Sequence, residues 1–216
     1  MCLPIRPPND PCCHCCDEGP CRVELCARTT ASWEAIRLTR LGARAALVSQ
    51  LTGLEKTVVN RLYRQLHGRP SPPGQLPFTD AWYLKKSRRM LQAAVVWRLS
   101  QRLAREDVSP ARRLIDVYEC YCWLVPEPLL DITRVAFVPH LVAVQDWQER
   151  SCEGCGARYV APAKSLGTTC WGCRRYYRYR CRRCGAAILA QPKGRPREVC
   201  TACQRSQHRE AFRTWL

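Results

Sequence analysis

The sequence has no apolar run of about 18 residues, the length that a membrane-spanning helix requires. Its first ten residues contain three prolines and no apolar core of a secretory signal, so we expect a cytoplasmic protein without a membrane span. Glycine-rich phosphate loops are also missing, both the Walker type and the Gly-x-Gly-x-x-Gly type. These absences argue against membrane proteins, secreted proteins and common nucleotide-binding enzymes.

Histidine is scarce, and its placement does not indicate catalysis. Only His14, His67, His140 and His208 occur, and none accompanies a recognisable Ser or Cys nucleophile motif. The sequence also lacks a carboxylate cluster of the kind that phosphoryl chemistry with Mg²⁺ needs. We therefore predict that the chain is not an enzyme.

Cysteine, in contrast, is abundant, with 17 residues. Eight of them form four Cys-x-x-Cys pairs, namely Cys152/Cys155, Cys170/Cys173, Cys181/Cys184 and Cys200/Cys203. Two residues between cysteines let both sulfurs point to one side of a tight turn, and two such turns complete a tetrahedron of thiolates around zinc. Disulfides are the alternative, but they belong to oxidising compartments. We predict one zinc ion in the first two pairs and a second in the last two.

The order in which the pairs combine remains open from sequence. Sequential pairing gives two separate sites, whereas cross-braced pairing joins the first pair with the third and the second with the fourth. The segments Gly156–Thr169 and Gly185–Val199 each have the length of a zinc ribbon, which favours sequential pairing. Four thiolates leave no open position for water or substrate, so we expect structural rather than catalytic metals.

The remaining cysteines are less regular. Cys12, Cys13, Cys15 and Cys16 surround His14, and Cys21 and Cys26 follow. A third metal site and a disordered, easily oxidised tail both fit, and adjacent cysteines favour the tail. Cys120 and Cys122 have no second pair nearby and are predicted to lie in the core.

The charge is strongly positive and uneven. The formal net charge is +17, and residues 151–216 hold 14 Lys and Arg residues against three Asp and Glu residues. Such density predicts binding to a polyanion, with nucleic acid as the first candidate, although a solvated basic surface is the simpler alternative. The arginines that we predict to contact DNA phosphates alternate with Tyr176, Tyr177 and Tyr179; they are Arg174, Arg175, Arg178, Arg180, Arg182 and Arg183.

Two amphipathic helices are predicted over residues 33–51 and 54–66, with Gly53 in the turn between them. This pattern fits a DNA-binding helix-turn-helix and an ordinary helical hairpin equally well. In the first case, Lys56, Arg61 and Arg64 on the outward face would contact DNA.

Three further helices are expected. One runs from Ala81 to about Arg105 with Asp80 as its cap, and the next follows Ser109 and Pro110. The last spans residues 129–147 and is interrupted at Pro139. The predicted fold is mainly α: a disordered tail over 1–31, a helical domain with a helix-turn-helix-like hairpin over 32–148, and a basic module of two Cys₄ zinc ribbons in tandem over 149–216.

Several segments resemble the FlhC family of flagellar transcriptional activators. They are Leu41-Gly42-Ala43-Arg44, Leu62-Tyr63-Arg64-Gln65-Leu66-His67-Gly68 and Pro72-Pro73-Gly74-Gln75-Leu76-Pro77-Phe78 with Trp82, followed by the first two Cys-x-x-Cys pairs. The resemblance covers about Glu34 to Cys173.

The resemblance implies a function. FlhC proteins bind a smaller partner, FlhD, in a ring of four FlhD and two FlhC chains, which binds and bends promoter DNA and recruits RNA polymerase. It also implies one structural zinc, held here by Cys152, Cys155, Cys170 and Cys173. The cysteine-rich residues 1–31 and the quartet from Cys181 to Cys203 depart from the family pattern. A zinc-ribbon module that only assembles with other proteins, without sequence-specific DNA binding, is the alternative function.

Overall fold

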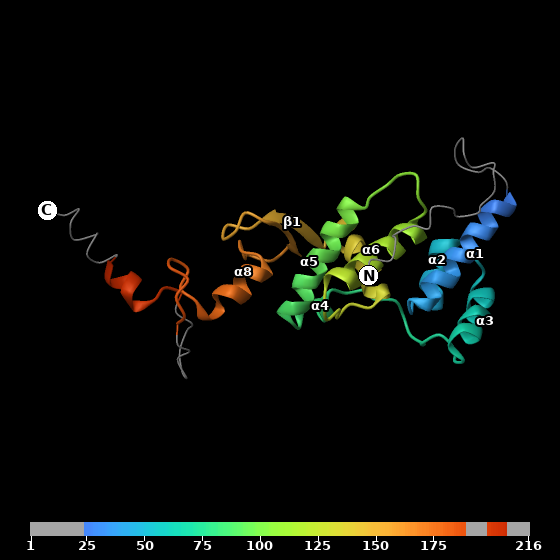
Figure 1. Cartoon of the computed structure of the whole chain (residues 1–216), viewed down its shortest axis with the longest axis horizontal. Helices are drawn as coiled ribbons and strands as arrows, with labels where there is room; N and C mark the ends of the chain where they lie inside the picture. The colour runs from blue at the N-terminus through green and yellow to red at the C-terminus, as the bar shows by residue number, and fades with distance from the viewer. Residues whose placement is uncertain (1–23, 189–197, 207–216) are drawn as a thin grey trace. The chain divides into compact units, whose positions relative to one another are not determined.

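The computed structural model describes residues 24–188 and 198–206, which form a mainly helical chain with one small two-stranded sheet (Figure 1). This confirms the predicted fold class. Contacts divide the chain into two compact units, residues 1–148 and residues 149–216. The separation into a tail, a helical domain and a zinc-binding module stays a prediction. In the described part, no helix is both long and apolar enough to span a bilayer.

The first described helix, α1 (Glu24–Arg40), begins inside the segment that was predicted to be a disordered tail. Residues 24–31 are therefore helical, which corrects the prediction at that end. No proline lies between Pro20 and Pro70, so nothing in the sequence stops the helix from extending upstream of Trp33. The cluster of Cys12, Cys13, Cys15 and Cys16 around His14 lies outside the described residues.

The helix predicted over residues 33–51 is in fact two helices, α1 and α2 (Ala45–Thr52). Gly42 ends α1 with a φ of 85°, a left-handed conformation that favours glycine. The N–H of Ala43 then bonds back to the carbonyl of Leu38 at 2.9 Å, and that of Gly42 bonds to Thr39 at 2.9 Å. These two bonds form a Schellman motif, which turns the chain before α2 begins.

Helix α3 (Lys56–His67) completes a group of three helices that contact one another, and α1 to α3 lie side by side in Figure 1. The turn between α2 and α3 has three residues, so the predicted helix-turn-helix-like hairpin is present. Val59 and Tyr63 face the core and are almost fully buried. Lys56, Arg61 and Arg64 are exposed, as an amphipathic helix requires.

The long helix predicted over residues 81–105 is also two helices, α4 (Ala81–Leu84) and α5 (Ser87–Arg102). The break lies at Lys86, whose backbone is extended. Asp80 does not cap α4 with its side chain, which corrects that prediction. Its carboxylate instead accepts a hydrogen bond from Nε1 of Trp147 at 2.9 Å, a partner that is distant in sequence.

Helices α6 (Pro110–Leu124) and α7 (Ile132–Ala143) pack against α5. The predicted cap of α6 is confirmed, because Oγ of Ser109 accepts a hydrogen bond from the N–H of Arg112 at 2.9 Å. Pro139, expected to interrupt the last helix, lies inside α7 without ending it. Cys120 is half-buried, whereas Cys122 is exposed and is therefore not a core residue.

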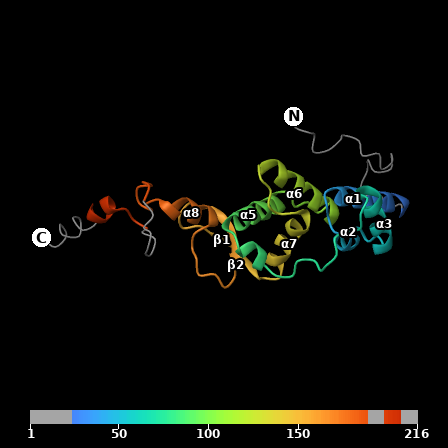
Figure 2. The ribbon, with the colours of Figure 1, turned by 90° about the horizontal axis from the view of Figure 1, so that it is seen from below.

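The second unit is small and begins within a hairpin. Strand β1 (Trp147–Ser151) pairs with β2 (Arg158–Pro162), and the two lie together in Figure 2. Helix α8 (Trp171–Tyr176) follows and continues into the 3₁₀ turn η2 (Tyr177–Tyr179). Trp147, predicted to end a helix, instead opens β1, because α7 has already ended at Ala143.

Candidate metal centres

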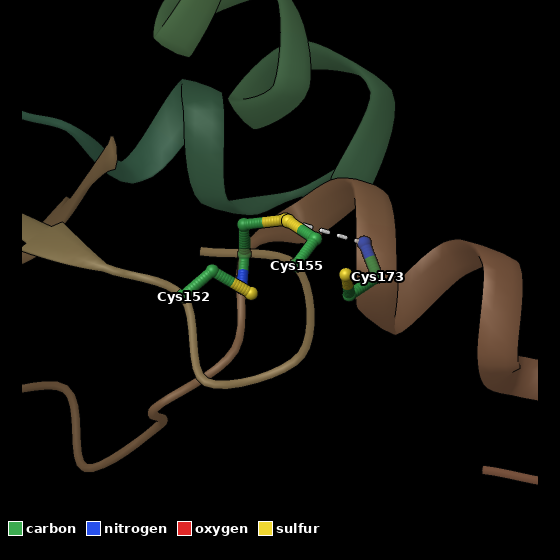
Figure 3. Close-up of side chains that lie close together, drawn as sticks. Cys152, Cys155 and Cys173 are labelled. Carbon is green, nitrogen blue, oxygen red and sulfur yellow. Dashed lines mark hydrogen bonds between the residues drawn. The ribbon is translucent and has the colours of Figure 1, made fainter. Parts of the chain in front are cut away.

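The first cysteine quartet joins a turn after β1 to the start of α8. Cys152 and Cys155 flank that turn, and Gly156 closes it with a φ of 69°, while its N–H bonds to the Cys152 carbonyl at 2.8 Å. Cys170 caps α8, and its Sγ accepts a hydrogen bond from the N–H of Cys173 at 3.3 Å. Figure 3 shows the side chains of Cys152, Cys155 and Cys173 close together.

The sulfur positions fit a tetrahedral zinc ion. In each quartet the four Sγ atoms lie within 4.8 Å of one another. A Zn–S bond of about 2.3 Å gives tetrahedral sulfurs about 3.8 Å apart. In the structure, the Sγ atoms of Cys155 and Cys170 are 3.8 Å apart, and those of Cys184 and Cys200 are 3.7 Å apart. A disulfide requires about 2.05 Å, and the ten cysteines from Cys120 to Cys203 are free.

The structure groups the cysteines sequentially, first pair with second and third with fourth. This is the arrangement that the ribbon-length segments favoured, and it replaces the cross-braced alternative. Both quartets contain sulfur ligands alone, which suits a soft or borderline ion such as zinc better than Mg²⁺ or Ca²⁺. All four thiolates of a quartet would be needed to hold the ion, which has a structural role in such sites.

In each quartet, backbone N–H groups lower the pKa of the first thiol, which favours the thiolate that binds a cation. Burial raises the pKa of the Cys152 thiol, but N–H groups of Cys170, Gly154 and Cys155 together hold that pKa at about 6. N–H groups of Cys200 and Cys184 likewise lower the pKa of Cys181 to about 6. The first sulfur is therefore ionised at neutral pH.

The last thiol of each quartet has a raised pKa instead. Burial and the neighbouring thiols raise the pKa of Cys173. Hydrogen bonds with the thiols of Cys184 and Cys200 raise the pKa of Cys203 to about 12. Because a cysteine binds a metal as the thiolate, metal uptake at these positions releases protons.

The first quartet is also backed by a small apolar cluster. Tyr159 and Ala161 of β2 are buried beside Cys152, and Trp171 packs against them. The Tyr159 hydroxyl donates to the Gly167 carbonyl at 3.0 Å, which holds the loop between the two half-sites. A side chain at position 154 would have its Cβ 3.2 Å from the Cys173 sulfur, so glycine keeps this side of the site open.

The six arginines proposed for DNA contact have different environments. The Arg174 guanidinium lies 4.7 Å from the centre of the Trp171 ring, and Arg174 is half-buried. Arg178 lies over Tyr179 at 5.3 Å, and Arg180 lies over Tyr176 at 5.1 Å. Tyr176 and Tyr179 are themselves more than half exposed.

The remaining three arginines of this set are all exposed. Arg182 is paired with Glu198 at 3.4 Å, so part of its charge is already balanced. Arg175 and Arg183 are exposed on either side of η2 in the sequence. Lys56, Arg61 and Arg64 belong to α3 in the other unit and form a separate exposed set.

The helical unit contains a buried polar centre that was not predicted from the sequence. Gln92 and Tyr121 are buried, and the Tyr121 hydroxyl donates to Oε1 of Gln92. That hydroxyl also accepts hydrogen bonds from the N–H groups of Leu129 and Leu130 at 3.0 and 3.1 Å. A single glutamine within an apolar helix face was the available signal, but its partner lies on another helix.

Comparisons with known proteins agree on one family. The family model described as "Flagellar transcriptional activator (FlhC)" matches residues 26–178. The chain is 27% identical over 134 residues to the flagellar transcriptional regulator FlhC of Sodalis glossinidius (strain morsitans), covering 60% of this chain and 68% of that protein. It is 29% identical over 147 residues to FlhC of Variovorax paradoxus (strain S110), covering 65% and 72%.

The match includes the first quartet and the arginines up to Arg178, whereas the second quartet begins after it ends. The relatives are named as transcriptional regulators, and none of these names describes an enzyme. The chain belongs to the FlhC family of flagellar transcriptional regulators.

Proposed function

We propose that this chain is the DNA-binding subunit of an activator of flagellar genes. It would act in the cytoplasm together with FlhD, in a complex of four FlhD and two FlhC chains, bind promoter DNA and recruit RNA polymerase. The observation that carries this proposal is the arginine–tyrosine segment, Arg174 to Arg183, which follows directly from the first metal centre. Its mixture of cationic and aromatic side chains is suited to phosphates and sugars.

Zinc in the first quartet would hold this segment in place. Cys170 and Cys173 open α8, and α8 and η2 carry the arginines from Arg174 to Arg178. The ion would be bound by Cys152, Cys155, Cys170 and Cys173, and it would supply structural cross-linking between the β1 turn and α8. Since few side chains are buried in the described part of the module, such a cross-link would fix its shape.

Exposed apolar side chains in the helical unit support a protein partner. Phe78 and Trp123 expose 76% and 74% of their surfaces, and Leu124 beside Trp123 exposes 49%. Large aromatic side chains are enriched at protein interfaces and are unfavourable in water. These exposed side chains support assembly with FlhD. They equally support the second candidate, a zinc-ribbon assembly protein that does not bind DNA itself.

Salt dependence of DNA binding distinguishes the two candidates. The complex with FlhD would be titrated with a flagellar promoter fragment and with a shuffled fragment of equal length, at several salt concentrations. Each phosphate contact makes the slope of log K, the DNA-binding constant, against log salt concentration more negative by about 0.9. We expect a steep negative slope for both fragments, and tighter binding to the promoter. Absence of salt-dependent binding to either fragment would support the assembly protein.

Charge-removing variants locate the contact. Arg175→Gln, Arg178→Gln and Arg183→Gln together should reduce the magnitude of the salt slope by about 2 to 3. Arg98→Gln, Arg102→Gln and Arg113→Gln remove the same charge from exposed positions on α5 and α6 and serve as the control. Equal effects of the two triple variants would show that net charge, rather than this segment, determines binding.

A further inference from the structure

The second cysteine quartet repeats the first in sequence. Cys-x-x-Cys-Gly-Ala occurs at residues 152–157 and again at residues 181–186. The second half-sites, Cys170/Cys173 and Cys200/Cys203, follow with the same Cys-x-x-Cys spacing. The loop between the half-sites differs in length by one residue. A shared ligand spacing alone is weak evidence of a repeat, so the backbone provides the test.

The backbone hydrogen bonds of the first module recur one by one in the second. In each module, four backbone N–H groups donate to equivalent carbonyls. They belong to the first cysteine, the residue after it, the glycine and the residue after the last cysteine. In the first module these bonds are Cys152 to Ala157, Glu153 to Thr168, Gly156 to Cys152, and Arg174 to Cys170. In the second they are Cys181 to Ala186, Arg182 to Glu198, Gly185 to Cys181, and Gln204 to Cys200.

The bonds to sulfur repeat as well. The N–H of Cys170 donates to the Cys152 sulfur at 3.1 Å, and the N–H of Cys200 donates to the Cys181 sulfur at 3.3 Å. The N–H of Cys203 donates to the Cys200 sulfur at 3.5 Å, as that of Cys173 does to Cys170. Gly185 has a φ of 72°, close to that of Gly156. The turns that carry the cysteines of the two quartets thus adopt one geometry.

The second module has less apolar support than the first. Trp171, after the third cysteine of the first quartet, corresponds to Thr201, which is exposed. Buried Tyr159 corresponds to Ile188, which is only half-buried. With so little buried surface among the described residues, bound metal must supply most of the cross-linking in the second module.

The arginine–tyrosine segment connects the two quartets, and the second module holds its far end. The N–H of Ile188 donates to the carbonyl of Tyr179 at 2.8 Å. Nη1 of Arg180 donates to the carbonyl of Gly185 at 3.2 Å, and the guanidinium lies over Tyr176. Only seven residues separate Cys173 from Cys181. The segment is therefore anchored at both ends by metal-binding turns.

We propose that residues 180–188 and 198–204 form a second copy of the metal-binding module, that Cys181, Cys184, Cys200 and Cys203 bind a second zinc ion, and that this ion sets the affinity of the arginine–tyrosine segment for DNA phosphates. The part that concerns DNA rests on the proposed function. The metal site itself lies beyond the residues that match the family model. Loss of the second ion would free the chain from Tyr179 onward, so that its arginines no longer present one fixed surface.

Metal content of the full chain in its complex with FlhD tests the site directly. Elemental mass spectrometry would compare the unaltered chain with the Cys181→Ser/Cys184→Ser variant. We expect the variant to lose one zinc per chain. Cys120→Ser/Cys122→Ser changes two cysteines outside both quartets and should lose none. An unchanged zinc content in the quartet variant would overturn the second site.

DNA binding by the same variants tests the coupling. Four thiolates and one Zn²⁺ carry a net charge of −2. In the variant the ion and two thiolates are lost and the other two cysteines take up protons, so the module becomes about two charges more positive. A pure charge effect would then strengthen binding. We expect instead a loss of about tenfold or more at low salt and a salt slope smaller in magnitude by about 2, because arginine contacts are lost. Unchanged or tighter binding would overturn the coupling.

A rescue variant separates metal loss from general damage. Cys184→His keeps a ligand at an exposed position and creates a Cys₃His site, which also binds zinc. We expect this variant to keep the second zinc and near-normal DNA affinity, and retention of zinc with a tenfold loss of affinity would overturn the coupling. If the unaltered complex holds zinc in both sites yet binds no DNA, the proposed function fails while the second metal site stands.

Discussion

The hydroxyl of Tyr121 is a buried polar group whose three partners come from two places in the helical unit. It contacts Gln92 of α5 and the N–H groups of Leu129 and Leu130, which precede α7. Nε2 of Gln92 in turn donates to the carbonyl of Glu127 at 2.8 Å. This network fixes the loop between α6 and α7, since buried N–H groups without partners are costly.

Tyr121→Phe is predicted to lower the free energy of unfolding by about 1–3 kcal/mol, because it leaves the N–H of Leu130 without its partner in the core. Urea denaturation of the complex-free chain, with zinc present, measures this change. Tyr118→Phe is the matched control, because the Tyr118 hydroxyl contacts the weakly hydrogen-bonding Cys122 thiol. Equal destabilisation by both variants would contradict the special role of Tyr121.

At the scale of elements, the two Cys-x-x-Cys-Gly turns are the parts that decide metal binding. Each presents two sulfurs from one turn, and each ends in a glycine with positive φ, Gly156 or Gly185. A Cβ added at either position would meet nothing within 4 Å, so space does not explain the glycines. Their backbone conformation does, since a residue with a side chain is strained there.

Gly156→Ala and Gly185→Ala should each weaken zinc binding at their own site by about 5- to 30-fold, the equivalent of about 1–2 kcal/mol of backbone strain. Competition with a chromophoric chelator measures both affinities. Gly156→Asn and Gly185→Asn are the controls, because asparagine tolerates the left-handed conformation better. If asparagine weakens binding as much as alanine, the cause is not the backbone conformation.

For the whole molecule, the two units differ in what stabilises them. The helical unit buries a continuous set of large side chains, among them Leu38, Tyr83, Met90 and Tyr121. In the described part of the second unit, the buried residues are few and two of them are metal ligands; they are Cys152, Tyr159, Val160, Ala161 and Cys181. Hydrophobic burial thus supports the first unit, and metal coordination would support the second.

Removal of zinc by a chelator should therefore unfold the second unit selectively. Hydrogen exchange of backbone amides measures this directly. The amides of Cys170 and Cys200, which bond to sulfur, should exchange at least about 100-fold faster without metal, because their acceptors lose their fixed positions. Amides in the middle of α5 and α6 should change little. Comparable acceleration in those helices would show that the first unit also depends on zinc.

The sequence by itself determined the local features of this protein. The ligand turns were predictable because two cysteines with two residues between them, followed by a glycine, favour a tight turn through short-range sterics. The Ser109 cap of α6 was predictable for the same reason, since its partner, Arg112, lies one helical turn away. The family motifs likewise lie within short stretches.

Only the tertiary structure decided the features that depend on distant residues. The position of Asp80 fits a helix cap, but its carboxylate accepts a hydrogen bond from Nε1 of Trp147. Gln92 accepts a hydrogen bond from the Tyr121 hydroxyl, which α6 places beside it. The sequential grouping of the quartets belongs to the same class, because each quartet joins half-sites that lie far apart in the sequence. The spacing of apolar residues indicates which side of a helix is buried. The hydrogen-bond partner of a buried polar side chain, however, depends on which other element packs against that side.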